Sequence, residues 1–213
     1  MEKKHIALFG ATGKTGREFL NLALDQGYQV TALVRDPSKL SIVDDRLQVL
    51  QGDVLSYEDV ASVVSTSDVV VSLFGQVKGS PKDLQTKGTA QIIKAMKANS
   101  IDKIISLSGG GLPFPEHDQP KFADKAIRFI MKLVVPHILN DAIAHAKVLE
   151  ESGLKWLIVR APRLTLEPKK NRYRVGWVGV NASTKIGRAD LVPFILKQVE
   201  SEKYLSQMPF VSY

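Results

Sequence analysis

The segment from Ile6 to Leu20, "IALFGATGKTGREFL", constrains the fold of this chain more than any other. An apolar run of strand type enters a turn in which every third residue is glycine, at Gly10, Gly13 and Gly16. A triphosphate-binding loop of the form G-x-x-x-x-G-K-[ST] would need a glycine at position 8, where the chain has Leu8. The spacing instead resembles the glycine turn of dinucleotide-binding folds. We therefore predict a strand, a phosphate-binding turn and a helix.

Each glycine of this turn has a physical role to fill. Gly10 would allow a tight turn after the strand, Gly13 would let a phosphate approach the backbone, and Gly16 would let the helix pack closely on the sheet. The N-terminus of the following helix presents free N–H groups to an anion. Further donors come from neighbouring side chains, those of Thr12, Lys14 and Thr15. An ordinary strand-to-helix turn could also use these glycines, so the rest of the chain has to decide.

Six apolar runs rich in strand-forming residues follow one another along the chain. They are Ile6–Phe9, Val30–Val34, Leu47–Leu50, Val69–Phe74, Ile104–Leu107 and Trp156–Val159. The runs are near-continuous rather than alternating, which is typical of strands buried on both faces of a parallel sheet. Helical patterns separate most of them. The sequence therefore predicts one α/β domain over residues 1–213, with a Rossmann-type, doubly wound parallel sheet and helices on both faces.

Three segments beyond the fifth run carry further expectations. The stretch "GGGLPFPEHDQP", residues 109–120, fits no regular element and is predicted to be a substrate lid. Residues 121–151 are helical by pattern but interrupted by Pro136, so we expect two helices or one kinked helix. Residues 161–213 are predicted to form a small C-terminal extension on the substrate side, with short strands in "RYRVGWVG" and "QMPFVSY" around a helix from about Arg188 to Glu200.

The first part of the segment 121–151 is a basic amphipathic helix. One face carries Phe122, Ala126, Phe129, Ile130 and Leu133, and the lysines lie largely off that face. Such a helix can lie on a membrane, but packing of the apolar face against the sheet explains the same pattern. We favour packing and expect no membrane partner.

Composition excludes several classes of protein. Of the 213 residues 44% are apolar and 24% are charged, as in soluble globular proteins, and the absence of cysteine excludes disulfides and thiolate metal sites. We expect no metal. The chain shows no signal-type apolar segment near residue 1, so we expect a cytoplasmic protein. The net charge of +7 is dispersed, which favours a solvated surface with an anion site over nucleic-acid binding.

The end of the second strand bears on the choice of cofactor. NAD sites usually carry a carboxylate there for the ribose 2′-hydroxyl, whereas NADP sites carry arginine for the 2′-phosphate. The first charged residue after "YQVTALV" is Arg35, followed by Asp36. Lys14 and Lys39 could lie nearby and add positive charge. We therefore predict NADPH as the cofactor, although a surface turn before Pro37 would also explain Arg35 and Asp36.

The motifs "GATGKTG", "VTALVRDPSKL", "QGDVL" and "VLEESGLKWLIVRAPRL" resemble the atypical short-chain dehydrogenases/reductases with NAD(P)H-binding (NmrA-like) domains, most closely their biliverdin-IXβ reductase/flavin reductase branch. The resemblance runs from Lys4 to about Leu164. It implies pyrophosphate contacts at Gly10, Thr12, Gly13, Lys14, Thr15 and Gly16, and 2′-phosphate contacts at Arg35 and Lys39. It further implies adenosine contacts at Asp53, Val54, Leu73, Phe74 and Gly75. Contacts near the nicotinamide are implied at Ser106, Leu107, Ser108, Pro162, Arg163 and Leu164.

The chain departs from short-chain dehydrogenases in its candidate catalytic residues. Those enzymes use Tyr-x-x-x-Lys, with the tyrosine as acid, but here Ile143 stands four residues before Lys147. The candidates that remain are Ser108, His145 and Lys147, each of which also has an ordinary structural explanation. A missing acid favours acceptors that need little protein-supplied proton transfer.

We therefore predict hydride transfer from NADPH to a small conjugated acceptor such as a flavin or quinone. Aromatic residues are possible platforms for such an acceptor: Phe114, Phe122 and Trp156. The alternative is a regulatory protein of the NmrA-like type that senses NADP(H) without turnover. The sequence does not indicate the oligomeric state.

Overall fold

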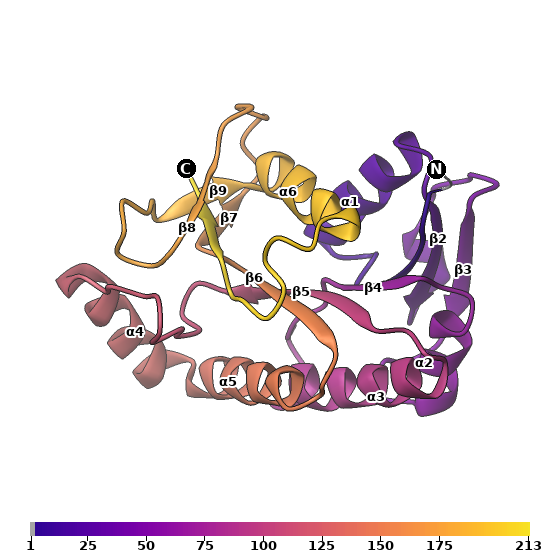
Figure 1. The fold of residues 1–213 in the computed structure, drawn as a ribbon, viewed down its shortest axis with the longest axis horizontal. Coiled ribbons are helices and arrows are strands. Elements are labelled where there is room, and N and C mark those ends of the chain that lie inside the picture. The colour runs from indigo at the N-terminus through magenta and orange to yellow at the C-terminus, as the bar shows by residue number, and fades with distance from the viewer. Residues whose placement is uncertain (1–2) are drawn as a thin grey trace.

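A computed structural model describes residues 3–213 as a mostly parallel sheet with helices on both faces (Figure 1). The sheet has eight strands in the order β3-β2-β1-β4-β5-β6-β10-β8, all parallel except β8 at the edge. The strands are β1 His5–Phe9, β2 Gln29–Val34, β3 Leu47–Gln51, β4 Val69–Ser72, β5 Lys103–Gly109, β6 Lys155–Ala161, β8 Arg174–Gly176 and β10 Phe210–Ser212. A separate parallel pair joins β7 Arg163–Thr165 to β9 Lys185–Gly187. The Rossmann-type prediction is confirmed.

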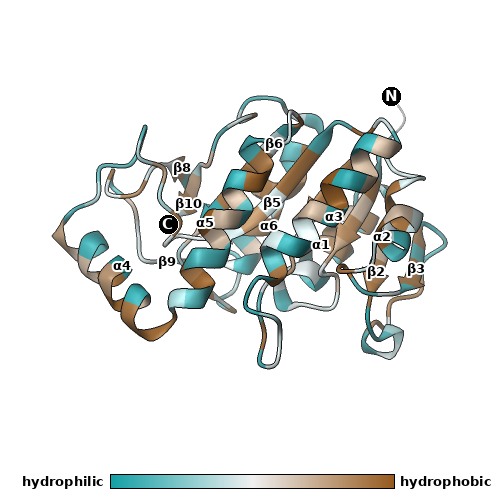
Figure 2. Cartoon of the chain, turned by 90° about the horizontal axis from the view of Figure 1, so that it is seen from below, coloured by the Kyte–Doolittle hydropathy of each residue, from teal (hydrophilic) through white to brown (hydrophobic). Residues whose placement is uncertain are grey.

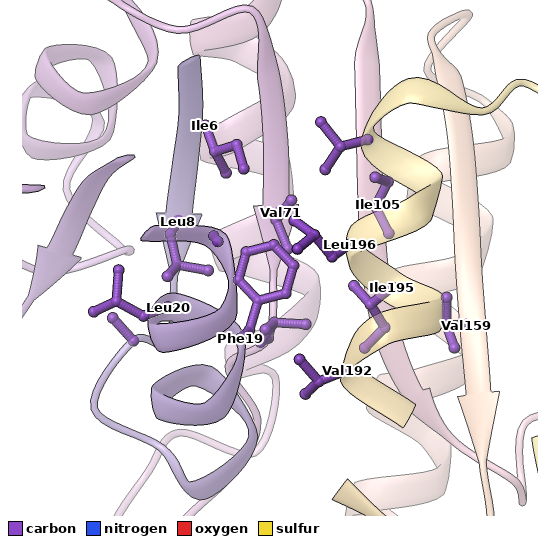
Figure 3. Packing of buried hydrophobic residues seen from close by; sticks show 14 of the residues in the cluster. Ile6, Leu8, Phe19, Leu20, Val71, Ile105, Val159, Val192, Ile195 and Leu196 are labelled. Atoms are coloured by element: carbon purple, nitrogen blue, oxygen red, sulfur yellow. The ribbon is translucent and has the colours of Figure 1, made fainter. Parts of the chain in front are cut away.

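The helices divide into two layers. They are α1 Lys14–Asp25, α2 Tyr57–Val64, α3 Leu84–Ala98, α4 Phe122–Val134, α5 Pro136–Glu150 and α6 Arg188–Glu200, with a 3-10 turn at Pro37–Lys39. Helices α1 and α6 cover one face, and α2, α3 and α5 cover the other (Figure 1). In the first layer, Phe19 of α1 lies against Val71 of β4 and near Leu196 of α6 (Figure 3). Both faces of the central strands are thus buried, which explains their near-continuous apolar sequences.

The C-terminal residues belong to the main sheet. Phe210 of β10 is in parallel register with Arg160 of β6, and β8 pairs with β10 on its outer side. Residues 161–213 therefore extend the main sheet, and α6 matches the predicted helix. The fourth predicted strand ends at Ser72, so residues 73–75 are free to line a cavity.

The helical segment after residue 120 divides at Pro136, as predicted, into α4 and α5. The expectation that its apolar face packs against the sheet is wrong for α4. None of the residues of α4 is buried, and Phe122, Phe129 and Leu133 are 88%, 62% and 67% exposed. Figure 2 shows α4 at one end of the molecule, apart from the helices that cover the sheet. Within residues 3–213, no helix has the length and apolar character needed to cross a membrane.

An ion pair buried within the fold anchors the loop 109–120. The Arg160 guanidinium of β6 donates to both carboxylate oxygens of Asp118, at 2.7 and 2.8 Å, and to the carbonyl oxygens of Leu112 and Met208. Burial opposes ionisation of Asp118, but these bonds and the charge of Arg160 hold its pKa below the ordinary value. The predicted lid loop is therefore fixed along this part rather than free.

Removing one partner of this pair should destabilise the protein strongly. Asp118→Asn leaves the fully buried Arg160 charge without its counter-charge, so we expect the free energy of unfolding to fall by about 3–5 kcal/mol. Denaturant unfolding measures this loss. As a control, Lys147→Ala breaks a solvent-exposed bridge to Glu151 and should change stability by less than about 0.5 kcal/mol. A loss of similar size in the two variants would contradict the anchoring role.

Candidate functional site

The first part of the site is a cavity of about 160 Å³ at the carboxyl ends of β1, β2, β3 and β4. We call it the proximal cavity. Ligands of open α/β sheets bind at this edge, where the strand order reverses. The cavity is lined by nine residues that the sequence predicted for the cofactor: Gly10, Thr12, Gly13, Arg35, Asp53, Val54, Leu73, Phe74 and Gly75.

Two glycines of the turn are needed by the fold itself. Gly10 has φ +90°, and a Cβ there would lie 2.5 Å from the Phe74 nitrogen. A Cβ on Gly16 would overlap the carbonyl oxygen of Gly10. Gly16 therefore allows the close approach of α1 to the end of β1, and Gly10 allows the turn after β1 to lie against the backbone that follows β4.

Gly13 has a different environment. A Cβ there would meet the Gly10 carbonyl oxygen at 3.3 Å and no other atom within 4 Å outside its chain neighbours. Gly13 is the residue before α1, and the first turn of α1 contains no acidic side chain. The free N–H groups and positive end of α1 are therefore available to an anion beside Gly13.

Arg17 contributes to this turn and was missed by the sequence reading. Its guanidinium donates to the carbonyl oxygen of Thr12 at 3.1 Å and to that of Lys39 at 2.9 Å. It therefore connects the glycine turn to the turn that follows β2 and adds a positive charge there. The sequence signal that could have indicated this role is the position of Arg17, four residues after Gly13 and thus about one helical turn beyond it.

The end of β2 presents a cation rather than a carboxylate to the proximal cavity. Arg35 is exposed and lines the cavity. Asp36 instead accepts hydrogen bonds from the Ser38 backbone N–H and hydroxyl, at 3.2 and 2.6 Å, and pairs with Lys39 at 3.3 Å. The Ser38 hydrogen bonds lower the pKa of Asp36, with a smaller effect from Lys39. The Asp36 carboxylate therefore interacts with residues of its own turn, Ser38 and Lys39.

A second cavity of about 380 Å³ lies beyond the end of β5, between the 109–111 loop, α4 and the C-terminal residues. We call it the distal cavity. The predicted residues Pro162 and Arg163 line it. Leu164 of β7 instead packs against the core and pairs with Ile186 of β9. Its apolar wall includes Ile127, Met131 and Phe210.

The remaining predicted cofactor residues flank the two cavities without lining them: Lys14, Thr15, Gly16, Lys39, Ser106, Leu107 and Ser108. The hydroxyl of Ser108 is buried and has no hydrogen-bond partner in the protein. Because buried hydroxyls are usually bonded, this one fits a ligand group at the end of β5. Ser108 directly precedes Gly109, the first residue of the distal cavity lining.

His145 of α5 is hydrogen-bonded to Ser106 of β5. Its Nε2 lies 3.0 Å from the Ser106 hydroxyl oxygen, and the side chain is almost fully buried. Burial lowers the pKa of His145 to about 4, despite an opposing effect of Asp141. The imidazole is therefore neutral near pH 7, and it lines neither cavity. This arrangement suits a positioning contact to β5 better than proton donation.

The predicted catalytic lysine and the predicted aromatic platforms lie outside the two cavities. Lys147 is on the exposed face of α5, paired with Glu151 at 3.7 Å, so the sequence expectation of a catalytic lysine has no geometric support. Of the three predicted platforms, Phe114 and Trp156 are buried and Phe122 is exposed, and none lines either cavity. In the distal cavity the lining aromatic ring is Phe210, which β10 brings from the far end of the chain. No cluster of three or more potential metal ligands occurs in the described part of the chain.

A substitution at Gly13 should separate binding from folding. Gly13→Val places a branched side chain where an anion would approach α1, so we expect cofactor affinity to collapse while circular dichroism and melting temperature change little. Gly16→Ala is the contrasting control, because its Cβ overlaps backbone and should lower the melting temperature. Unchanged affinity in Gly13→Val would show that the turn is only structural.

Comparisons with known proteins agree with this site. Residues 10–202 match the NAD(P)H-binding family. The chain is 25% identical to the uncharacterised protein YwnB of Bacillus subtilis, over 95% of each chain. Two solved structures share its fold. A short-chain dehydrogenase/reductase of Veillonella parvula in complex with NADP has a TM-score of 0.82 and 19% identity, over 100% of this chain and 95% of that one. ChuY of Escherichia coli O157:H7, described as an anaerobillin reductase, has a TM-score of 0.77 and 18% identity, over 98% and 96%.

The family match covers most of the chain and includes the glycine turn, Arg35 and every residue that lines the two cavities except Phe9 and Phe210. The chain therefore belongs to the NAD(P)H-binding family of oxidoreductases.

Proposed function

We propose that the protein is an NADPH-dependent reductase that transfers hydride to a flavin, a quinone or a similar conjugated acceptor. The observation that carries the proposal is the pairing of a dinucleotide cradle with an apolar-walled second cavity that no tyrosine, histidine or lysine lines. A reductase with this lining has groups to position an acceptor but lacks the tyrosine acid of short-chain dehydrogenases. The one carboxylate in the lining, Asp124, accepts a hydrogen bond from the Lys121 backbone N–H.

The chain's own residues suit NADPH in the proximal cavity. Backbone N–H groups at the start of α1, beside Gly13, would hold the pyrophosphate, and Arg35 would face the 2′-phosphate while Asp36 stays in its own turn. The unpartnered Ser108 hydroxyl would bond the nicotinamide end. When bound, the cofactor supplies the hydride. The bound NADP of the Veillonella relative supports a dinucleotide in this fold.

The distal cavity suits a flat apolar acceptor. Phe210, Met131 and Ile127 offer apolar contacts, and Arg163 offers a positive charge at the rim. Flavins and quinones accept hydride at an electron-poor conjugated centre and can take their proton from solvent. Positioning of the two reactants therefore supplies the catalysis. The name of ChuY, a reductase, supports this class of reaction.

A second candidate is a regulatory protein that senses NADP(H) without turnover. The same lack of a poised acid favours it, because a sensor needs only the cofactor cradle. Steady-state NADPH oxidation with a panel of flavins, quinones and tetrapyrroles separates the two, since a sensor binds the cofactor without consuming it. A small-molecule partner, the absence of nucleic-acid binding and a cytoplasmic location stay predictions.

The cofactor preference depends on Arg35. We expect NADPH to bind more tightly than NADH by at least about 10-fold, because a charge-assisted contact to the 2′-phosphate is worth about 1.5–3 kcal/mol and Arg35 is exposed. Arg35→Ala should remove most of this preference without weakening NADH binding. Arg46→Ala, which changes an exposed arginine paired with Asp44 outside the cavity, is the matched control. Equal affinity of the unmodified protein for both cofactors would contradict the assignment.

Turnover should not depend on a single side-chain acid. Ser108→Ala and His145→Gln should each lower the rate of NADPH oxidation by less than the ~10²–10⁴-fold expected from loss of a general acid. Cofactor affinity measured in parallel excludes a binding defect. A loss within that range at intact affinity would identify a dedicated acid and point to simple carbonyl substrates instead.

A further inference from the structure

Helix α4 exposes its apolar face to solvent, whereas an amphipathic surface helix usually buries that face against the protein. Its inner side contributes Ile127, Arg128 and Met131 to the distal cavity. Its outer side carries exposed apolar side chains, with exposed fractions between 56% and 88%: Phe122, Phe129, Ile130, Leu133 and Val134. The expected packing against the sheet does not occur, so this apolar face is exposed to solvent.

The charges beside the apolar face are all positive. Successive helical residues are about 100° apart, which places Lys121, Lys125 and Lys132 within about 40° of one another along one edge of that face. The one carboxylate between residues 121 and 134 is Asp124, which accepts a hydrogen bond from the Lys121 backbone N–H at 2.9 Å and lines the distal cavity. A negatively charged surface therefore complements the outer side of α4.

A second copy of the chain fits this face less well. A helix of 13 residues is about 20 Å long and about 10 Å wide, so its outer side offers an area on the order of 200 Å², against about 800 Å² per partner in stable interfaces. The neighbouring outer side of α5 does not enlarge the patch, because it carries Asn140, Lys147 and Glu150 around the half-exposed Ile143. Two copies facing each other would also bring their lysines together.

We propose that α4 binds the surface of an anionic lipid bilayer, with its apolar side chains in the interfacial region and Lys121, Lys125 and Lys132 at the headgroups. The inference goes beyond the proposed function and does not rest on it, because binding to lipid needs no turnover. Docking in this way brings a wall of the distal cavity to the lipid surface, since the two sides of α4 serve the bilayer and the cavity.

Vesicle co-sedimentation of the full chain tests the proposal. We expect binding to phosphatidylcholine vesicles containing about one third phosphatidylglycerol, little binding to phosphatidylcholine alone, and release at about 1 M salt, where the Debye length is about 3 Å. Phe129→Glu with Leu133→Glu, and separately Lys125→Glu with Lys132→Glu, should each weaken binding at least about tenfold. Ile143→Glu, on the polar outer side of α5, is the matched control and should bind as the unmodified protein does.

All these positions are exposed, so melting temperature and NADPH affinity should be unchanged in every variant, which separates this test from that of the reductase. Absence of binding to the anionic vesicles would overturn the proposal. Binding that survives both double substitutions would also overturn it. A dimer in sedimentation velocity that Phe129→Glu dissociates would assign the face to a second copy instead.

Discussion

The contact between the first strand and the first helix is the constraint on which the rest of the site depends. Gly10 makes the turn with φ +90°, and Gly16 lets α1 begin directly at the end of β1, because a Cβ on Gly16 would overlap the Gly10 carbonyl oxygen. This approach aims the positive end of α1 at the carboxyl edge of the sheet, beside the reversal of strand order between β1 and β4. Arg17 then fixes the glycine turn to the turn that carries Arg35. One close backbone contact thus positions both the pyrophosphate and the 2′-phosphate groups of the proposed cofactor.

The substrate side depends on contacts between residues far apart in sequence. Asp118 and Arg160 are 42 residues apart, and their pairing fixes the loop that lies beside the distal cavity. Phe210 reaches that cavity because β10 adds to the sheet beside β6. A hydrogen bond between Ser106 and His145 connects β5 to α5. The distal cavity therefore depends on contacts between residues far apart in the sequence, whereas the lining of the proximal cavity comes mainly from the turns that follow β1, β2, β3 and β4.

This difference explains what the sequence could predict. The strands, α6 and the break at Pro136 follow from local patterns, namely apolar runs and a proline, and the glycine spacing with Arg35 predicts part of the proximal lining. The rest of that lining was implied by the family resemblance: Asp53, Val54, Leu73, Phe74 and Gly75. Phe114 and Trp156 could be either platforms or core residues on the sequence alone, because an aromatic residue in a loop or strand looks the same in either place. The structure places both in the core. The sequence predicted the apolar face of α4 but not its exposure to solvent. Helical periodicity shows that a helix has an apolar and a polar face, but not which of them is buried.

The central claim is that the chain holds nicotinamide beside a conjugated acceptor in one fixed orientation. Single-turnover oxidation of NADPH deuterated at either the pro-R or the pro-S position of C4 tests this claim most directly, with the acceptor that gives the fastest turnover. A fixed nicotinamide predicts that deuterium at one position slows hydride transfer severalfold, while deuterium at the other has almost no effect. Equal slowing from both positions, or no oxidation with any acceptor, would contradict the account.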